Sequence, residues 1–429
     1  MTDQSRPREP AVGPRPPDGG EAVGVRGDYW SIVWRQFKKN RVAVVGLWLI
    51  LAIFTEAVFV PFLANKYPYY WYTPETGLTF PLLQGLTKVD WLLLIAFFLV
   101  LLIPVTRRVL RRSGWRYWSL HELRRAALVN GLIFLAAWTV LACLPHTTGR
   151  VLEREIVMVN GQPQAIYRER EYRRELAEGS TARCLFPPVP YAATDIHVGP
   201  RYGPPSAEHP FGTDSLGRSV AACVLYGTRV GTAVGFISVG ISVLIGVLVG
   251  GVSGYFGGWV DLVLQRVVEM VMCFPTLFLI LAIVAFWGPR LEVIMAAIGL
   301  TSWPGISRLI RANVLQIKTL DYITAARAQG LRSLYIIVRH ALPNGMTPVL
   351  VSATFGIAAA ITTESSLSFL GMGDPDYPSW GQLLMDSREV ATLSPAHLLV
   401  PGLAICLAVL AYNLAGEGVR DAIDPKLKV

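Results

Sequence analysis

Apolar residues gather along the chain in long, nearly unbroken runs separated by polar segments. Most of these runs are long enough to cross about 30 Å of hydrocarbon as a helix. The run at 91–105 is short for a span and, taken alone, also fits a re-entrant segment. Together the runs predict an all-α polytopic membrane protein with about eight transmembrane helices, at 42–63, 91–105, 126–145, 230–255, 267–287, 293–307, 349–370 and 398–416.

The polar segments between these runs divide the chain into parts. We expect a disordered cytosolic tail first, because residues 1–28 are rich in Pro, Gly and charge. This tail is no signal peptide, since the first apolar run starts only at Val42 and is too long for one. The remaining divisions are an amphipathic entry segment with the first span (29–63), an outer loop with an inserted transmembrane hairpin (64–145), an extracytoplasmic segment (146–225), a transmembrane core (226–418) and a cytosolic C-terminal tail (419–429).

The distribution of charge predicts the orientation of the spans. Loops that carry an excess of Lys and Arg stay in the cytosol. The segment 106–125 holds seven arginines against Glu122, and the segment 308–339 is similarly basic. The loop 373–397 is acidic and should lie outside. A topology with both termini in the cytosol and residues 146–225 outside agrees with all of these charge distributions. Residues 91–145 are therefore interpreted as a hairpin that dips to the cytosol.

Composition agrees with a membrane protein. The chain is 52% hydrophobic and 16% charged, against about 25% charged residues in soluble domains, and its mean hydropathy is +0.43. The net charge of +9 would also suit a nucleic-acid-binding protein. However, the basic residues cluster beside apolar runs, so we expect lipid and not nucleic acid as the partner of this charge.

The extracytoplasmic segment shows signals of small local elements. Asn160-Gly161 between two apolar stretches predicts a β-hairpin, with Pro163 limiting its second strand. Residues 168–178 alternate charge at helical spacing and predict a solvated helix, and 187–205 predicts a Pro-rich extended linker. Cys184 and Cys223 share this compartment in the predicted topology, which leaves a disulfide between them open.

The sequence shows no catalytic or metal-binding pattern. There is no GxxxxGK[ST] motif for nucleotide phosphates, no persuasive nucleophile–base pair, and no CxxC or metal-ligand spacing among the five cysteines. We therefore expect a protein that is not an enzyme and that binds no cofactor itself. Two acids lie inside predicted spans, Glu269 and Glu364. We favour structural hydrogen bonding for both, with a place on a translocation path as the alternative.

A distinctive cytosolic stretch runs from Asp321 to Pro343. Asp321 is a good N-cap and Gly330 can take the left-handed conformation that ends a helix. Between them we expect a short helix with Tyr322, Ile323, Ala325 and Ala326 largely on one side, where the small alanines let a partner surface approach. The second helix starts at Ser333 and must bend or end near Pro343. On pattern alone, an amphipathic helix on the membrane surface fits equally well.

This stretch resembles the EAA signature of bacterial ABC-importer permeases. The match comprises Thr324-Ala325-Ala326, then Gly330, then His340-Ala341-Leu342-Pro343. The resemblance implies that 322–330 is the coupling helix that sits in a cleft of the ATPase subunit. It assigns ATPase coupling to Tyr322, Thr324, Ala325, Ala326, Gly330 and Pro343. Thr324 replaces the signature glutamate, which puts one salt bridge to the ATPase in doubt. His340, in place of the usual isoleucine, resembles the dipeptide and oligopeptide branch.

Further motifs resemble the same branch over about half of the chain, from Pro210 onward. His209 to Arg218 reads HPFGTDSLGR, with Ser219 where the family usually has Asp. Thr362 to Gly371 contains Glu364 in a form of the family sequence EASLSFLG. Others are at 257–261, 379–381 and 418–425.

The resemblance implies a type I ABC importer transmembrane domain, whose six-helix core would carry the hairpin as an insertion. It implies the second permease subunit of a heterodimer, a multi-pass protein of the bacterial inner membrane that works with two ATP-binding subunits. Those partners would hold ATP and Mg, and an extracytoplasmic binding protein would deliver a peptide. Alternatives within the family are glutathione and nickel complexes. Alternatives outside it are a secondary transporter and an export or scaffold subunit.

Overall fold

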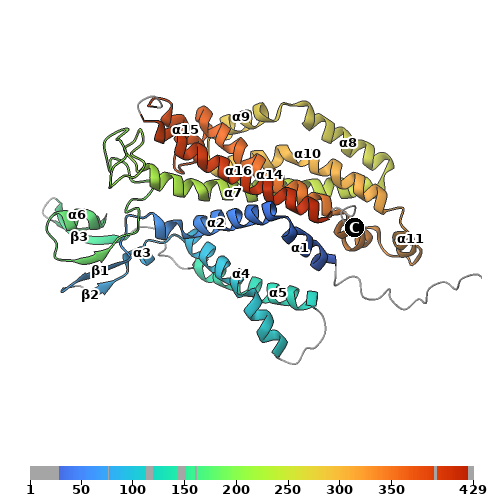
Figure 1. The fold of residues 1–429 in the computed structure, drawn as a ribbon, viewed down its shortest axis with the longest axis horizontal. Coiled ribbons are helices and arrows are strands. Elements are labelled where there is room, and N and C mark those ends of the chain that lie inside the picture. The colour runs from blue at the N-terminus through green and yellow to red at the C-terminus, as the bar shows by residue number, and fades with distance from the viewer. Residues whose placement is uncertain are drawn as a thin grey trace, which may run out of the picture.

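The computed structural model describes residues 29–75, 77–112, 119–143, 151–159, 162–390 and 394–423. Long helices run side by side along the longest axis of the molecule, with strands at one end and a short helix, α11, at the other (Figure 1). These are called the sheet end and the α11 end. The predicted tail at 1–28 and the last residues, 424–429, lie outside the described residues.

The central bundle is built from apolar helices that match the predicted core spans. Within the residues that the structure describes, five helices are long and apolar enough to cross a membrane, or six when a bent pair counts as one span. They are α2 (Arg41–Leu63), α7 (Val220–Phe256), α10 (Leu291–Ile317), α14 (Thr347–Leu367, continued by the π-helical turn η2, Ser368–Met372) and α16 (Pro395–Ile423), with the bent pair α8 (Gly258–Cys273) and α9 (Thr276–Trp287). A short helix, α1 (Tyr29–Lys39), precedes α2 and packs against the end of α16.

The prediction of one continuous span at 267–287 is wrong. The chain bends by 82° between α8 and α9. Pro275 has no N–H to donate, and the residue before a proline avoids helical angles. Phe274 is accordingly extended, with φ −86° and ψ 132°. The span is therefore a broken helix pair.

Small residues let α7 pack closely against α10, as their four-residue spacing predicts. A Cβ atom on Gly250 would lie 2.2 Å from the carbonyl oxygen of Ser307, and one on Gly254 would lie 2.8 Å from that of Arg311. No side chain fits between these backbones, so the two helices form a rigid pair.

The inserted segment forms a helical hairpin of α4 (Lys88–Arg112) and α5 (Ser119–Cys143), as predicted. It is attached to the bundle by an ion pair to α7, in which Arg229 Nη1 lies 2.5 Å from Asp90 Oδ1, and by apolar packing of Leu94 against Val58 of α2. The residue before Arg229, Thr228, joins α7 to α2 by donating from Oγ1 to Glu56 Oε1 (3.1 Å). Whether α4 and α5 cross the membrane fully, which would complete the eight predicted spans, stays a prediction.

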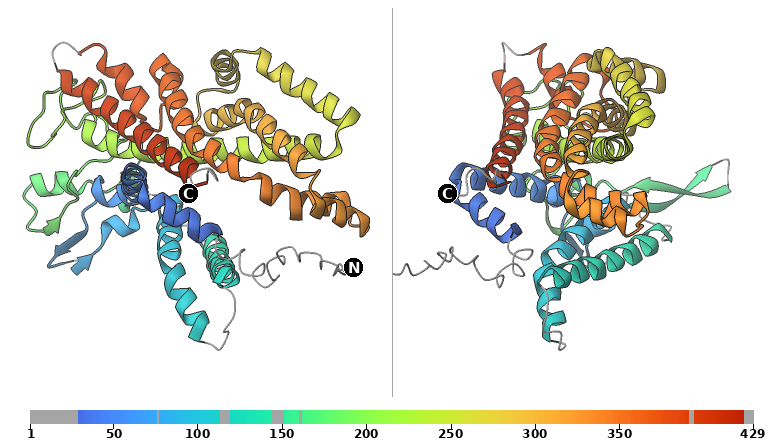
Figure 2. Two further views of the ribbon diagram at one scale, coloured as in Figure 1. Left: turned by 45° about the vertical axis from the view of Figure 1, so that its right-hand side comes forward. Right: turned by 90° about the vertical axis from the view of Figure 1, so that its right-hand side faces the viewer.

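The sheet end contains the predicted β-hairpin, β3 (Leu152–Val159) with β4 (Gln162–Glu169). It projects away from the bundle (Figure 2). Pro163 is accommodated inside β4, opposite Met158. The helix predicted at 168–178 is shorter, α6 (Tyr172–Ala177). The turn residues Asn160 and Gly161 lie outside the described residues.

Sequence patterns missed a second sheet here. Its order is β2 (Gly77–Thr79), β1 (Tyr70–Thr73), β5 (Arg183–Leu185), all antiparallel. A short helix, α3 (Pro81–Gln84), follows β2. Because β1 precedes the inserted hairpin and β5 follows it, the outer loop and the extracytoplasmic segment form one unit. Cys184 and Cys223 are free thiols, so the disulfide left open above is not present.

The polar loop before α7 is held by a buried ion pair. An aspartate just before an apolar run, such as Asp214, can cap a helix. Here, however, its Oδ2 lies 2.6 Å from Arg218 Nε, and its Oδ1 accepts from the backbone N–H groups of Leu216 and Arg218. The helix α7 begins only at Val220, with no side-chain cap. Asp214 therefore folds the loop and does not start the span.

Candidate coupling surface, core cavity and sheet-end pocket

The short helix α11 (Asp321–Ala328) lies just beyond the end of α10 and corresponds to the predicted coupling helix. Gly330 has φ +75°, the left-handed conformation expected at the stop. Leu320, and not Asp321, occupies the N-cap position, without a side-chain cap bond. Asp321 lies in the first turn, where its charge still favours the helix dipole. The predicted capping role of Asp321 is therefore wrong, while the predicted stop is confirmed.

The residues that the sequence analysis expected on one face of α11 lie on two different faces, one buried and one exposed. Ile323 and Ala326 are buried against α7, α10 and the segment after α11, in a cluster with Tyr255, Ile310, Val314, Ile336 and Ile337. Tyr322, Thr324 and Ala325 are exposed. Residues three apart share a helix face, whereas neighbours do not. Ala326 therefore packs within its own chain, and Ala325 is the small residue left on the free side.

Polar contacts also attach α11 to the bundle. The Arg327 guanidinium carbon lies 4.8 Å from the centre of the Tyr255 ring, and Arg327 Nε donates to the Tyr255 hydroxyl (3.3 Å). On the other side, Asn344 Nδ2 donates to the Tyr322 hydroxyl (3.1 Å). Since Tyr255 lies in the last turn of α7, these contacts join α11 directly to the end of that helix.

The segment after α11 contains α12 (Ser333–Ile336), a π-helical turn (η1, Ile337–Ala341) and α13 (Leu342–Gly345). Pro343 lies in the first turn of α13, where its missing N–H breaks no bond. The expected bend near Pro343 is thus absorbed by a π turn that continues the helix. Ser333 starts α12 without capping it. His340 contacts the Tyr335 ring edge, with 5.8 Å between ring centres.

A second polar cluster fixes α8 at the same end of the molecule. Arg311 Nε and Nη2 each lie 2.6 Å from one oxygen of the Asp261 carboxylate, and Ser253 Oγ donates to the same group (2.5 Å). This bidentate pair joins the start of α8 to the end of α10. Sequence reasoning singled out Asp261 only within a motif and missed Arg311.

The two intramembrane acids lie in different surroundings. Glu364 is 2% exposed and accepts from Ser368 Oγ (2.6 Å) and Ser365 Oγ (3.4 Å), all within α14 and its continuation. Glu269 is partly exposed and paired with Arg266 (2.6 Å). It lines a hollow of about 570 Å³ between α8 and α10, together with Asp261 and Arg311. The geometry supports a structural role for Glu364, and it brings only Glu269 to an open space.

A smaller cavity, of about 170 Å³, lies between α7, α10 and α14 and is called the core cavity. Small, hydroxyl-bearing and aliphatic side chains line it, and no charged residue does. Its lining residues, Ser242, Ser302, Gly305, Ser352, Gly356 and Thr363 among them, come from the middle of the three helices. No motif pointed to it, because the lining residues are brought together only by packing.

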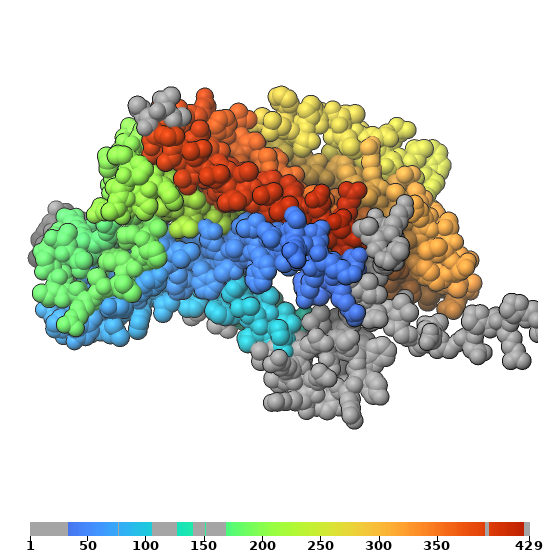
Figure 3. Space-filling model, in the orientation of Figure 1, coloured from blue at the N-terminus to red at the C-terminus, as the bar shows by residue number. Residues whose placement is uncertain are grey.

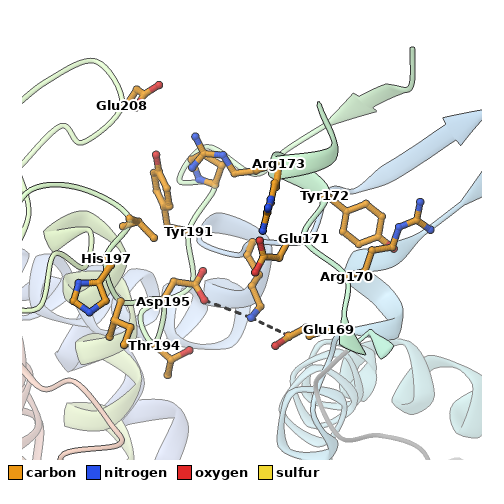
Figure 4. Close-up of a pocket in the computed structure, with 15 residues that line it drawn as sticks. Glu169, Arg170, Glu171, Tyr172, Arg173, Tyr191, Thr194, Asp195, His197 and Glu208 are labelled. Atoms are coloured by element: carbon orange, nitrogen blue, oxygen red, sulfur yellow. Dashed lines mark ion pairs between the residues drawn. The ribbon is translucent and has the colours of Figure 1, made fainter. Parts of the chain in front are cut away.

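A pocket of about 700 Å³ lies at the sheet end between the base of the β-hairpin and the loop 190–208. Lys66 Nζ lies 2.8 Å from Glu169 Oε1 and 3.4 Å from Asp195 Oδ1, and the dashed lines beside Glu169 and Asp195 in Figure 4 mark these ion pairs. Burial would lower the pKa of the Lys66 ammonium, but its contacts with Glu169 and Asp195 outweigh this and hold the pKa above its ordinary value. Lys66 therefore stays charged and holds β4 to the loop.

No group of three or more His, Cys, Asp or Glu side chains that could hold a metal ion occurs among the described residues.

Comparisons with known proteins agree with these features. A family of binding-protein-dependent transport system inner membrane components matches residues 242–429. The N-terminal transmembrane domain of oligopeptide transport permease C matches residues 28–82. The chain belongs to this family of inner membrane transport components. It is therefore a multi-pass permease subunit and not an enzyme, as predicted.

Three relatives are named as permease proteins of peptide or glutathione transport systems. The chain is 39% identical over 247 residues to the dipeptide transport system permease protein DppC of Alkalihalophilus pseudofirmus, covering 57% of this chain and 81% of the relative. It is 40% identical over 225 residues to the glutathione transport system permease protein GsiD of Pectobacterium atrosepticum, covering 52% and 75%. A putative peptide transport system permease of Brucella suis is 40% identical over 238 residues, covering 55% and 79%.

Solved structures resemble the chain more distantly. A chain of the MetNI methionine ABC transporter in inward-facing conformations matches with a TM-score of 0.39 and 19% identity, covering 47% of this chain and 96% of that one.

Proposed function

We propose that this chain is one of two homologous permease subunits of an ATP-driven importer for dipeptides or oligopeptides. Its partners would be a second permease, two ATP-binding subunits that carry ATP and Mg, and an extracytoplasmic binding protein. Family membership and the names of the relatives support this proposal. The single observation that carries it is α11, a short helix with one face packed on the bundle and the other free.

Coupling would pass through the two faces of α11. The exposed Tyr322, Thr324 and Ala325 would lie in a cleft of an ATP-binding subunit. The buried Ile323 and Ala326 would pass a movement of that subunit to α7 and α10. Gly330 would keep the helix short by ending it in a left-handed turn.

In this arrangement the α11 end is cytosolic and the sheet end is outside. Figure 3 shows these two regions at opposite ends of the long axis, and the basic and acidic loops support this direction. A single cysteine at position 170 should react with a membrane-impermeant reagent in intact cells, and one at position 115 should not. Labelling at 115 would overturn the inserted hairpin's orientation.

The sheet end would help to dock the binding protein. Its two sheets and its pocket form a structured unit beyond the bundle. Removing Ile156–Glu178 should weaken the stimulation of ATP hydrolysis by the binding protein and leave basal hydrolysis intact. Unchanged stimulation would show that this unit serves another purpose.

A substitution series on α11 tests the coupling proposal. Ala325→Asp places a charge on the free face, so the permease should keep its thermal unfolding midpoint but lose its ATP-binding subunits or its peptide uptake. Ala326→Asp buries the charge within the chain's own core, which should also lower the midpoint. Ala177→Asp, on the exposed end of α6 at the opposite end of the molecule, is the control for the thermal unfolding midpoint and for binding of the ATP-binding subunits, and it should change neither of these two readouts. Wild-type subunit binding and uptake in Ala325→Asp would refute the coupling role.

Glutathione is the second candidate substrate, because one relative is named for its transport. Uptake of a neutral dipeptide and of glutathione by the reconstituted complex, each with excess of the other as competitor, would separate the two.

A further inference from the structure

The core cavity lies near the middle of three long apolar helices. Ser242 is near the middle of α7, Ser302 and Gly305 are near the middle of α10, and Gly356 is near the middle of α14. Ser302 and Gly305 are exposed on the surface of this chain. The cavity is therefore reachable from outside the bundle and is not a sealed packing defect.

The walls of the cavity offer hydrogen bonds without charge. Ser242 is 3% exposed, and its hydroxyl has no hydrogen-bond partner among the described residues although it lines the cavity. A buried hydroxyl away from water is costly unless it is paired. Ser352 and Thr363 of α14 and Ser302 of α10 add hydroxyl groups to the same walls. This combination favours a ligand with neutral donors and acceptors.

The volume limits the size of such a ligand. An apolar protein cavity of about 150 Å³ takes up one benzene molecule, and the core cavity measures about 170 Å³. It therefore has room for one aliphatic or aromatic side chain together with part of its backbone. A charged terminus would be expensive there, because no lining residue carries an opposite charge.

We propose that the core cavity is a subsite of the transport path that holds one uncharged residue of the passing peptide. The Ser242 hydroxyl pairs with the backbone amide of that residue, and the space beside Gly305 and Gly356 takes its side chain. This inference rests on the proposed peptide import and adds the place where one peptide residue is bound. It predicts that the permease itself, and not only the binding protein, discriminates peptides by side-chain size.

Two glycines provide a matched test. A Cβ atom added to Gly305 meets no other atom within 4 Å, and the same holds for Gly240 of α7. Both residues are exposed in the middle of core helices. Only Gly305 lines the cavity. Gly305→Leu adds a bulky side chain at a residue that lines the cavity, whereas Gly240→Leu adds the same side chain elsewhere.

The experiment measures ATP-dependent uptake of glycylglycine and phenylalanylphenylalanine by the complete complex in vesicles. Gly305→Ala should lower uptake of the bulky peptide at least five-fold more than that of glycylglycine, and Gly305→Leu should lower both at least ten-fold. Gly240→Leu should leave both rates and their ratio unchanged. Because one binding protein delivers both peptides, its own selectivity cancels when each variant is compared with the wild type.

A second variant separates binding from packing. Ser242→Ala removes an unpaired hydroxyl, so it should leave the thermal unfolding midpoint unchanged or raised, while the KM for both peptides rises at least three-fold. Equal uptake by Gly305→Leu and Gly240→Leu, with both complexes fully assembled, would overturn the subsite. If Gly305→Leu alone loses the second permease, the subsite is also overturned, because this surface would then be a contact between the two permeases. Absence of peptide uptake by the wild type would instead refute the proposed function.

Discussion

The sheet end and the α11 end of this permease are stabilised by different kinds of interaction. At the sheet end, side chains from parts of the chain far apart in sequence interlock. Lys66 bridges Glu169 and Asp195, and His397 Nε2 lies 2.9 Å from the Thr213 carbonyl oxygen. At the α11 end, one short helix rests on an apolar cluster and a few polar contacts.

This difference suits the two ends to different tasks. Many long-range contacts resist partial opening, because breaking one leaves the others in place. A local helix with one buried face is fixed to its neighbours yet keeps a second face for another protein. We infer that the sheet end is a rigid frame. We infer that the α11 end is a joint, that is, the place where a movement of a bound protein is passed to the bundle.

The largest expected effect follows from the buried pair at the sheet end. Arg218→Met leaves the Asp214 carboxylate buried without its charge partner, which should lower the free energy of unfolding by about 3 kcal/mol. The pair Arg174–Glu178 has the same i,i+4 spacing but is exposed. Arg174→Met is thus a matched control and should leave the unfolding curve in detergent unchanged. Equal midpoints for the two variants would contradict the rigid-frame view.

A smaller effect should appear at alkaline pH. The pKa of Lys66 is raised in the folded protein from its ordinary value of 10.5. The bridge therefore stabilises the sheet end fully below that pH and is lost as the pH rises through the higher folded value. Hydrogen–deuterium exchange of residues 64–73 should become faster, relative to the α11 end, only in this alkaline range. In Lys66→Met the exchange should be fast at every pH. A sharp increase at alkaline pH in that variant would show that the Lys66 bridge is not its cause.

The smallest effect concerns the joint. Tyr255→Phe removes the hydroxyl that accepts from Arg327 but keeps the ring beneath the guanidinium. The free energy of unfolding should fall by no more than about 0.5–1 kcal/mol. Tyr255→Leu also removes the stacked ring and should cost more and reduce coupling of hydrolysis to uptake. If Tyr255→Phe alone uncouples the complex, the hydrogen bond and not the packing transmits the movement.

The sequence predicted the long helices of the central bundle, since a helix in lipid must satisfy its backbone internally and therefore appears as an apolar run. The turn at Gly330 was equally visible, because its conformation excludes most other residues. Pro275 indicates the bend at Phe274 in the sequence, but a prediction based on a count of apolar residues does not take it into account.

Other features depend on parts of the chain that meet only in three dimensions. Nothing near Tyr70 in the sequence shows that it pairs with Leu185. Likewise, periodicity identifies the faces of α11 but not which of them the rest of the chain covers, so Ala326 was assigned to the wrong side. The core cavity escaped notice for the same reason, as serines and glycines on three helices form no motif.

The pairing of β1 with β5 bears on how such a chain can be built. Strands on either side of the inserted hairpin are neighbours in one sheet, and paired strands lie about 4.8 Å apart. The intervening segment therefore leaves the core and returns to it at nearly the same point. A hairpin also brings the chain back to the side of the membrane from which it departed. A segment arranged in this way can be added or removed as a whole without reversing any helix that follows, because the chain on either side of it keeps its path.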